Sequence, residues 1–383
     1  MIFFALSLTV FLVFLFTPHP FAFQLPAPSL QSLPPNLPLG LPAPVPVPED
    51  NPQTTEKIAL GRRLFFDRRL SPNDTMSCAM CHVPTQGFTV NETRLAVGIN
   101  GQTTKRNSPT LYNVAYQRRL FHDGREFTLE DQIISPMTNP VEMGNPSMGY
   151  VIDKVRRLPG YREQFQQVFG TDVSVATLGK AISAYERTLL SGNSPFDRWY
   201  FGGDKTAVSA EVKAGFKIFS GRGQCSTCHS VSKEGALFTG QGFHNTGVAQ
   251  LKLIPEKTIE VDLGGGLIVQ MPRAQLDEIL LPPSKDLGRY EITYDPTDLW
   301  RYKTPSLRNV ALTAPYMHNG VLLTLEEVIN YYDRGGTGAE GQDPRIAPLH
   351  LKPEEKRALL ALLQSFTGDN VAILAQEAAV ADH

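Results

Sequence analysis

Residues 78–82 read Cys-Ala-Met-Cys-His, and residues 225–229 read Cys-Ser-Thr-Cys-His. Together these two pentapeptides contain all four cysteines of the chain. Two thiols three positions apart can each add to one vinyl group of the same porphyrin, and the next residue, a histidine, can reach the iron. No cysteine is left over to complete a zinc site or a disulfide. The pattern therefore predicts two covalently bound c-type haems, held by Cys78, Cys81 and His82 and by Cys225, Cys228 and His229.

The overall composition is that of a folded protein of ordinary charge. The 383 residues are 42% hydrophobic, enough for about two globular domains. A net charge of -2 provides no basic field for a polyanion. We therefore expect no nucleic-acid partner.

The N-terminus carries an apolar run over residues 2–16, which is shorter than the roughly 20 residues of a membrane-spanning helix. We expect residues 1–23 to be a signal peptide. No Lys or Arg precedes the run and residues 21–23, Phe-Ala-Phe, make a poor cleavage site, so an uncleaved membrane anchor is the alternative. Thioether attachment to Cys-x-x-Cys-His follows export in bacteria, which predicts the periplasm or the outer cell surface.

Prolines dominate the next segment. Twelve of them occur between Pro18 and Pro52. This composition disfavours helix and sheet and favours an extended polyproline chain. Residues 24–52 are therefore predicted to be a linker, either a stalk or the remnant of a leader.

The chain repeats itself beyond the two cysteine motifs. Residues 106–133 align without a gap with residues 302–329, and 11 of the 28 positions are identical. Each half contains a haem motif, a Pro-Ser/Thr-Leu-x-Asn-Val-Ala segment and a His-x-Gly turn. The repeat predicts two cytochrome c-like haem domains that arose by internal duplication, at residues 53–200 and 201–368, followed by a tail at residues 369–383.

Apolar residues at three- and four-residue intervals predict a mainly α-helical fold. The periodic segments are residues 55–67, 173–190, 209–219 and 353–366. The second half is longer than the first, and we assign the extra length to residues 250–285. Within that segment, residues 257–263 and 267–271 flank three glycines and predict a small β-hairpin insertion.

Three further motifs carry a family resemblance. Residues 60–67 read Leu-Gly-Arg-Arg-Leu-Phe-Phe-Asp, residues 139–143 read Asn-Pro-Val-Glu-Met, and residues 314–320 read Ala-Pro-Tyr-Met-His-Asn-Gly. With the two haem motifs, they make residues 53–368 resemble the bacterial di-haem cytochrome c peroxidase family, which includes a MauG-like branch. The resemblance implies an enzyme that uses hydrogen peroxide.

The same resemblance assigns roles to individual residues. It implies that His82 ligates the peroxidatic iron and His229 the iron of an electron-transferring haem. It places the distal acid–base residue at Glu142 and a companion amide at Gln132. A carboxylate can move the proton that peroxide cleavage requires, and an amide can orient the peroxide without competing for that proton.

The family also binds a calcium ion between the haems. The resemblance places its ligands at the side chain of Asn107 and the main-chain carbonyls of Thr313 and Pro315. These are hard oxygen donors of the kind that calcium prefers. The sequence alone contains no signature for this site.

Two departures from the peroxidase branch point to the MauG-like branch. The loop at residues 97–105 lacks the histidine that closes the resting peroxidatic haem in many members. We therefore expect an open, five-coordinate iron at His82. Fourteen residues after His318, where the peroxidase branch has a methionine ligand, the chain has Tyr332. A phenolate is a hard donor that favours ferric and higher states.

A third departure affects the path between the haems. Both branches usually have Phe-Trp-Asp-Gly-Arg, whereas residues 121–125 read Phe-His-Asp-Gly-Arg. Imidazole is harder to oxidise than indole, so His122 is either a hydrogen-bonded bridge that couples the haems or a structural histidine.

The function expected from these features is the oxidation of a redox protein by peroxide. Equivalents generated at the N-terminal haem would leave through the C-terminal haem, either to aromatic side chains of a protein substrate, as in MauG-like enzymes, or to a reduced cytochrome donor. The alternatives are a cytochrome c peroxidase with a small cytochrome donor and a di-haem electron carrier without catalysis.

Overall fold

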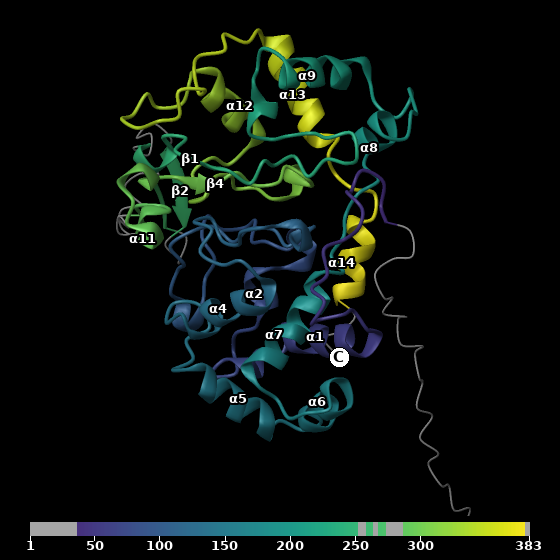
Figure 1. The fold of residues 1–383 in the computed structure, drawn as a ribbon. Helices are drawn as coiled ribbons and strands as arrows, with labels where there is room; N and C mark the ends of the chain where they lie inside the picture. Colours follow the sequence, from purple (N-terminus) through teal and green to yellow (C-terminus); the bar gives the residue numbers. More distant parts are fainter. Residues whose placement is uncertain (1–36, 252–257, 263–266, 273–285, 380–383) are drawn as a thin grey trace, which may run out of the picture.

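Short helices joined by long loops make up most of the fold (Figure 1). The structure is a computed structural model that describes residues 37–251, 258–262, 267–272 and 286–379. The expected signal peptide or anchor at residues 1–23 lies outside the described residues. Among the described residues, no helix is both long and apolar enough to cross a membrane.

The mainly helical character is as predicted. The helices up to residue 200 are α1 (Thr55–Phe66), α2 (Cys78–Cys81), α3 (Leu129–Gln132), α4 (Ile134–Thr138), α5 (Met148–Arg157), α6 (Tyr161–Phe169), α7 (Val175–Glu186) and α8 (Pro195–Tyr200), and Phe196 of α8 lies in the core of the C-terminal half. Those that follow are α9 (Ala210–Ser220), α11 (Tyr290–Thr293), α12 (Leu325–Asp333), α13 (Pro353–Gln364) and α14 (Val371–Ala379).

Strands are few and short. Strand β1 (Phe243–His244) pairs antiparallel with β4 (Tyr302–Lys303), and His244 lies opposite Tyr302. Strand β2 (Thr258–Asp262) pairs antiparallel with β3 (Ile268–Pro272). The glycines expected to form the turn between β2 and β3 lie outside the described residues.

The four helices expected from periodicity correspond to α1, α7, α9 and α13. Polar side chains cap three of them: Thr54, Ser174 and Ser209 accept hydrogen bonds from main-chain N–H groups in the first turns of α1, α7 and α9. Helix α1 packs against α7, and α9 packs against α13. Each pair lies at the centre of one half of the molecule.

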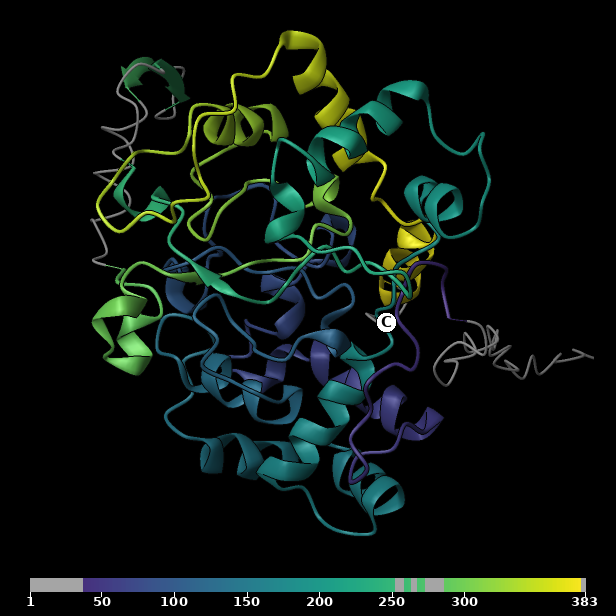
Figure 2. The same ribbon diagram turned by 45° about the horizontal axis from the view of Figure 1, so that its top comes forward.

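Two apolar cores follow from this pairing. Side chains from α1, α5 and α7 form the core of the N-terminal half, and side chains from α9, α12 and α13 form the core of the C-terminal half. The expected tail at residues 369–383 includes α14, whose Ala378 is buried in the N-terminal core. Helix α14 therefore packs on the first half, beside the first described segment of the chain (Figures 1 and 2).

The described part of the predicted linker, residues 37–52, packs against the protein instead of extending away from it. The carbonyl of Gly40 accepts hydrogen bonds from the main-chain N–H of Ala236 and from the guanidinium of Arg308. Gly40 has a φ of 87°, and a β-carbon there would overlap the carboxylate of Asp197. Proline-rich composition predicts an extended backbone but carries no information about what that backbone contacts.

A buried ion pair holds this segment in place. The guanidinium of Arg308 donates to both carboxylate oxygens of Asp197, at 2.8 and 2.9 Å, and to the carbonyls of Ala236 and Gly40. Both side chains of the pair are almost completely inaccessible to solvent. Removal of either charge would therefore leave its partner buried and unpaired.

Main-chain hydrogen bonds join the two halves in a reciprocal pattern. The N–H of Asn107 donates to the carbonyl of His318, and the N–H of Lys303 donates to the carbonyl of His122, both at 2.7 Å. Asn107 and His122 are the alignment partners of Lys303 and His318 respectively. Equivalent segments of the two halves therefore meet through equivalent bonds.

We predict that Asp197→Ala lowers the free energy of unfolding by about 3–5 kcal/mol, because Arg308 loses its buried counterion. Urea unfolding of the haem-loaded protein at neutral pH measures this change. Asp153→Ala, which removes an exposed partner of Arg156, is the control and should cost less than about 1 kcal/mol. Equal small losses in both variants would contradict a structural role for the buried pair.

Candidate functional site

Both Cys-x-x-Cys-His motifs lie on single helical turns. Cys78–Cys81 form the short helix α2, and Cys225–Thr227 form a 3-10 turn. A helical turn brings residues i and i+3 onto one side, so the two thiols of each motif face the same way. This geometry lets one porphyrin react with both thiols.

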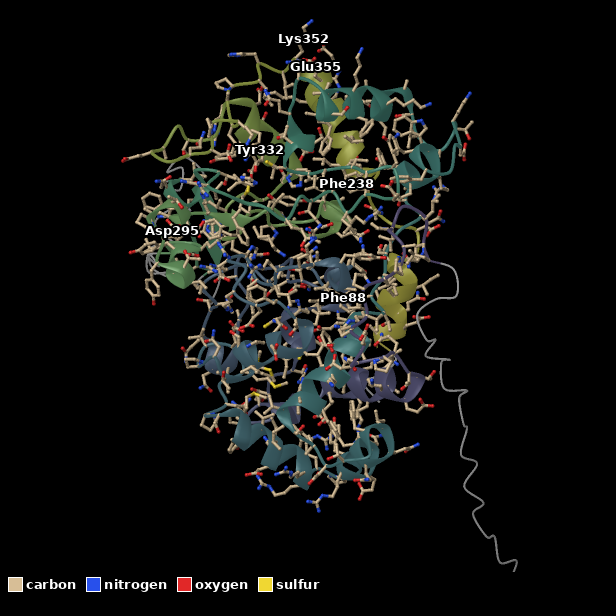
Figure 3. The ribbon with its side chains drawn as sticks, in the orientation of Figure 1. Phe88, Phe238, Asp295, Tyr332, Lys352 and Glu355 are labelled. Atoms are coloured by element: carbon tan, nitrogen blue, oxygen red, sulfur yellow. The ribbon has the colours of Figure 1, made fainter. Side chains whose placement is uncertain are left out.

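The histidine after each pair is oriented by a main-chain carbonyl. Nδ1 of His82 lies 3.1 Å from the carbonyl oxygen of Phe88, and Nδ1 of His229 lies 2.8 Å from that of Phe238. A carbonyl can only accept, so each Nδ1 carries the proton and each Nε2 keeps its lone pair for a metal. Both phenylalanines are fully buried and have positive φ values, 54° and 50° (Figure 3 labels both).

Burial also keeps both imidazoles neutral. Desolvation lowers the pKa of His82 and lowers the pKa of His229 to about 4. A neutral imidazole with a free Nε2 is the form that ligates iron. The residues present therefore fit an axial histidine at each site.

A cavity of about 380 Å³ lies beside His82. Its lining includes all the residues that the sequence assigns to the N-terminal haem site, from α2, α3 and the loops around residues 107–125 and 139–143: Cys78, Cys81, His82, His122, Gln132 and Glu142. The structure therefore brings together residues that are up to 64 positions apart in the chain.

Glu142 is held by its own motif. Nδ2 of Asn139 donates to Oε1 of Glu142 at 2.8 Å, and the carbonyl of Glu142 accepts from the N–H of Ile99. Burial raises the pKa of Glu142, while Arg125 and Asn139 act in the opposite direction. A carboxyl with a raised pKa on a cavity wall accepts a proton more readily than a free carboxyl does, as a group that takes up and releases a proton must.

The loop at residues 97–105 lies directly against this motif. The N–H of Ile99 bonds to the Glu142 carbonyl, and a β-carbon at Gly98 would overlap the carbonyl of Val141. His82 and His122 are the only histidines among the residues that line the cavity. Residues 97–105 contain no histidine, so this loop contributes none to the cavity.

His122 makes a defined contact at the boundary between the halves. Its Nε2 lies 2.8 Å from the carbonyl of Asn107, so Nε2 carries the proton. Burial lowers the pKa of His122 to about 4, which keeps the ring neutral. Nearby, the ring of His318 stacks on Tyr302 with a centroid separation of 3.6 Å.

Tyr332 lies in the C-terminal half beside the second cysteine motif. It is close enough to Cys225 and Cys228 for their charges to act on it, and burial raises its pKa. Within the described part of the chain its hydroxyl makes no hydrogen bond, whereas the hydroxyl of the adjacent Tyr331 donates to the carbonyl of Thr246. Figure 3 shows Tyr332 in the same half of the molecule as Phe238.

The positions expected to hold calcium are brought near one another. The side-chain amide of Asn107 donates through Nδ2 to the carbonyl of Arg94, which leaves Oδ1 as its oxygen donor. The main-chain bond from Asn107 to His318 joins it to the segment that contains Thr313 and Pro315. Among the described residues, no cluster of three or more His, Cys, Asp or Glu could hold a metal ion.

Comparison with known proteins identifies the family. Residues 55–206 match the family described as di-haem cytochrome c peroxidase. The methylamine utilization protein MauG of Methylorubrum extorquens is 36% identical over 325 residues, 84% of this chain and 81% of that protein. The cytochrome-c peroxidase IdrP1 of Denitromonas iodatirespirans is 37% identical over 340 residues, 86% of each chain.

The chain belongs to the di-haem cytochrome c peroxidase family. A solved structure supports this: a MauG-like protein associated with microbial copper homeostasis is 31% identical, with a TM-score of 0.71, and the match covers 88% of this chain and 96% of that one. The protein is a peroxidase-type oxidoreductase that uses haem cofactors, a peroxide substrate and a redox partner.

Sequence reasoning missed several parts of the di-haem peroxidase site. The carbonyls of Phe88 and Phe238 orient the axial histidines, yet they lie six residues after His82 and nine after His229, so no common spacing reveals them. Glu186 also lines the N-terminal cavity, as do two residues of the C-terminal half, Glu291 and Ile292. Only the fold brings these residues to the cavity.

We predict that Asn139→Ala shifts the pH dependence of the peroxide reaction to higher pH. Asn139 stabilises the ionised Glu142 by a hydrogen bond, so its loss raises the pKa of that carboxyl further. The rate, limited by ionised Glu142, should then decline at a higher pH during acidification. Stopped-flow kinetics measures the midpoint, with the exposed Asn91→Ala as control. An unchanged midpoint in Asn139→Ala would show that this bond does not set the pKa.

Proposed function

We propose that peroxide reacts at an N-terminal haem attached through Cys78 and Cys81, with His82 as ligand, and that no prior reduction is needed. When bound, this haem supplies the iron that takes up peroxide and the electrons that cleave its O–O bond. The observation that carries the proposal is that Glu142 shares a cavity with His82 and is held there by Asn139.

Glu142 moves the proton in this proposal. It takes the proton from the oxygen nearer the iron and returns it to the leaving oxygen, a role worth about 10²- to 10⁴-fold in rate. Its burial supports this role, because the raised pKa reduces the cost of holding the proton between the two steps. Gln132, on the same cavity, orients the peroxide through its amide.

Direct access to the iron is supported by the loop at residues 97–105. This loop contains no histidine, and Nε2 of His122, the other histidine on the cavity, is already bonded to Asn107. The face opposite His82 is therefore proposed to be open in the resting protein.

Cys225 and Cys228 would hold the second haem through thioether bonds, and His229 and Tyr332 would bind its iron. Burial of Tyr332 beside both cysteines supports this assignment. Burial alone disfavours the phenolate, but a ferric iron supplies the positive charge that stabilises it. With Tyr332 as a hard anionic donor, the bound haem would supply a centre of lowered reduction potential that can share oxidising equivalents.

The electrons are proposed to come from aromatic side chains of a protein substrate, as in MauG-like enzymes. The open face proposed for the first haem and the proposed ligand Tyr332 both favour a protein substrate as the source of electrons. The alternative is that a small reduced cytochrome donates the electrons. The similarity to a protein named cytochrome-c peroxidase supports this alternative. A neutral His122, hydrogen-bonded at the boundary, fits a bridge between the haems better than a site of oxidation.

A calcium ion is proposed to bind Oδ1 of Asn107 and the carbonyls of Thr313 and Pro315. The orientation of the Asn107 amide supports this, because its nitrogen is engaged by Arg94 and its oxygen is left for a cation. All three donors lie at the boundary between the two halves.

Two haem domains related by internal duplication are proposed, at residues 53–200 and 201–368, with the β2–β3 pair as part of an insertion in the second. Matching local structure supports the duplication. Thr128 and Thr324, which are alignment partners, both cap helices through their side chains. Asn113 and Asn309, also partners, both adopt a left-handed conformation with φ of 59° and 58°.

Export to the periplasm or the outer cell surface is proposed from the apolar run at residues 2–16 and the need to attach haem after export. A tether to the membrane through this segment is the alternative fate of the N-terminus.

We predict that Glu142→Gln retains both haem spectra and slows the reaction with peroxide by about 10²- to 10⁴-fold, because the proton acceptor is lost. Stopped-flow absorbance of the all-ferric protein measures this rate. Glu163→Gln, on the exposed side of α6, is the control and should react like the wild type. Wild-type kinetics in Glu142→Gln would remove Glu142 from the mechanism.

We predict that Tyr332→Phe changes the ligation of the C-terminal haem, with loss of the phenolate charge-transfer absorption and a higher reduction potential. Tyr331→Phe is the matched control: it removes the neighbouring hydroxyl and its bond to Thr246 but should leave the haem spectrum intact. If Tyr332→Phe has the spectrum of the wild type, another group holds that position.

A further inference from the structure

Glu186 is a buried acid without a role in the proton transfer described above. It is the last residue of α7, it is 5% exposed, and it lines the N-terminal cavity together with Cys78 and Cys81. Its Oε2 has no hydrogen-bond partner among the described residues. Burying an unpaired carboxyl costs free energy, so its presence at this position requires an explanation.

The other half of the molecule shows that the fold does not need an acid here. In each half a glycine lets two helices touch: Gly61 of α1 meets the carbonyl of Ala181, and Gly215 of α9 meets the carbonyl of Ala358. Five residues after Ala181 stands Glu186, and five residues after Ala358 stands Leu363, which is also buried.

The same helix pairing therefore accepts a leucine in one half and carries a carboxyl in the other. Packing alone would favour the leucine, because an apolar side chain pays no desolvation cost. The acid stands only on the half whose cavity is proposed to receive peroxide.

Among the described residues no charged side chain forms an ion pair with Glu186, although the positive charge of Arg187 lowers its pKa from a distance. Arg187, which follows it in the chain, donates hydrogen bonds to one oxygen of Glu130 from α3 and to the hydroxyl of Ser183, and it forms an ion pair with the other oxygen of Glu130. The positive charge of Arg62 on α1 lowers the pKa of Tyr185. The negative charge of Glu130 raises the pKa of Glu186 by repulsion. From α2, Cys78 also faces it, but thioether attachment would remove the ionisable thiol.

Burial raises the pKa of Glu186 to about 8, against the opposing effect of Arg187. The side chain is therefore mainly a neutral carboxylic acid at neutral pH. In a site of low dielectric constant, a change of one unit charge nearby shifts such an equilibrium strongly.

We propose that Glu186 is a redox-linked acid of the N-terminal haem site, which holds a proton while that haem is reduced and releases it when the haem is oxidised. The inference rests on the proposed function only in placing a haem in this cavity. When a one-electron oxidant such as ferricyanide removes one electron from the loaded site, the O–H bond of the Glu186 carboxyl would break, its electron pair would stay on the carboxylate oxygen, and the proton would pass to solvent water. Because one electron and one proton leave together, the net charge of the cavity does not change. This lowers the free energy needed to oxidise a buried site.

The test measures the ferric/ferrous reduction potential of the N-terminal haem in the loaded protein as a function of pH. In the wild type, the potential should fall with rising pH by up to about 59 mV per unit, which corresponds to one proton taken up per electron. In Glu186→Gln and Glu186→Leu, this dependence should be lost or sharply reduced. The leucine variant copies Leu363, and the glutamine variant retains the shape of the side chain if the leucine variant fails to fold.

Redox-difference infrared spectroscopy provides an independent readout. The wild type should show the carbonyl band of a protonated carboxylic acid that disappears on oxidation, and Glu186→Gln should lack it, with Glu163→Gln as the unaffected control. A wild-type pH dependence and an unchanged band in Glu186→Gln would overturn the inference. Peroxide kinetics on the same samples reports on Glu142 separately: a wild type that ignores peroxide but shows the Glu186-dependent band would refute the proposed peroxide chemistry and support this assignment.

Discussion

The hydrogen bond from each motif histidine to a buried main-chain carbonyl is the interaction on which both haem sites depend. It fixes the tautomer, so that Nε2 of His82 and of His229 is the nitrogen left for iron. The acceptor carbonyls belong to Phe88 and Phe238, whose rings are anchored in the two apolar cores and whose backbones adopt the left-handed conformation. The packing of each half is thereby coupled to the orientation of its iron ligand.

Main-chain hydrogen bonds also organise the boundary between the two halves. Asn107 and Lys303 donate to the carbonyls of His318 and His122 through equivalent bonds. The neutral oxygen donors proposed for calcium come from these same parts of the two halves. Arg106 adds ion pairs to Asp123 in its own half and to Asp286 in the other. The two halves are therefore joined by bonds from main chain and side chain alike, which would hold the two proposed haem sites at a fixed separation.

The sequence could predict what depends on local spacing. Thioether chemistry demands the Cys-x-x-Cys-His pattern, and the apolar periodicity of α1, α7, α9 and α13 follows from their buried faces, so the haem motifs and the main helices were accessible from residue order alone. Contacts between distant segments were not. The proline-rich segment packs through Gly40 against the Arg308–Asp197 pair, which composition cannot reveal. Glu186, a single acid in an amphipathic helix, has the appearance of a solvated residue until the fold buries it.

The two halves differ chemically in what surrounds their irons. The N-terminal cavity contains acids of raised pKa, Glu142 and Glu186, and among the described residues its lining histidines are His82 and His122, whereas the C-terminal site contains a buried phenol. The first iron is proposed to be open to peroxide at rest, whereas the second is proposed to be bound by a side chain on each face. Electron paramagnetic resonance of the resting all-ferric protein, before and after addition of peroxide, distinguishes the two states of the iron. One high-spin and one low-spin haem are expected, with the high-spin signal lost within the first turnover. Two low-spin signals that peroxide leaves unchanged would contradict this proposal.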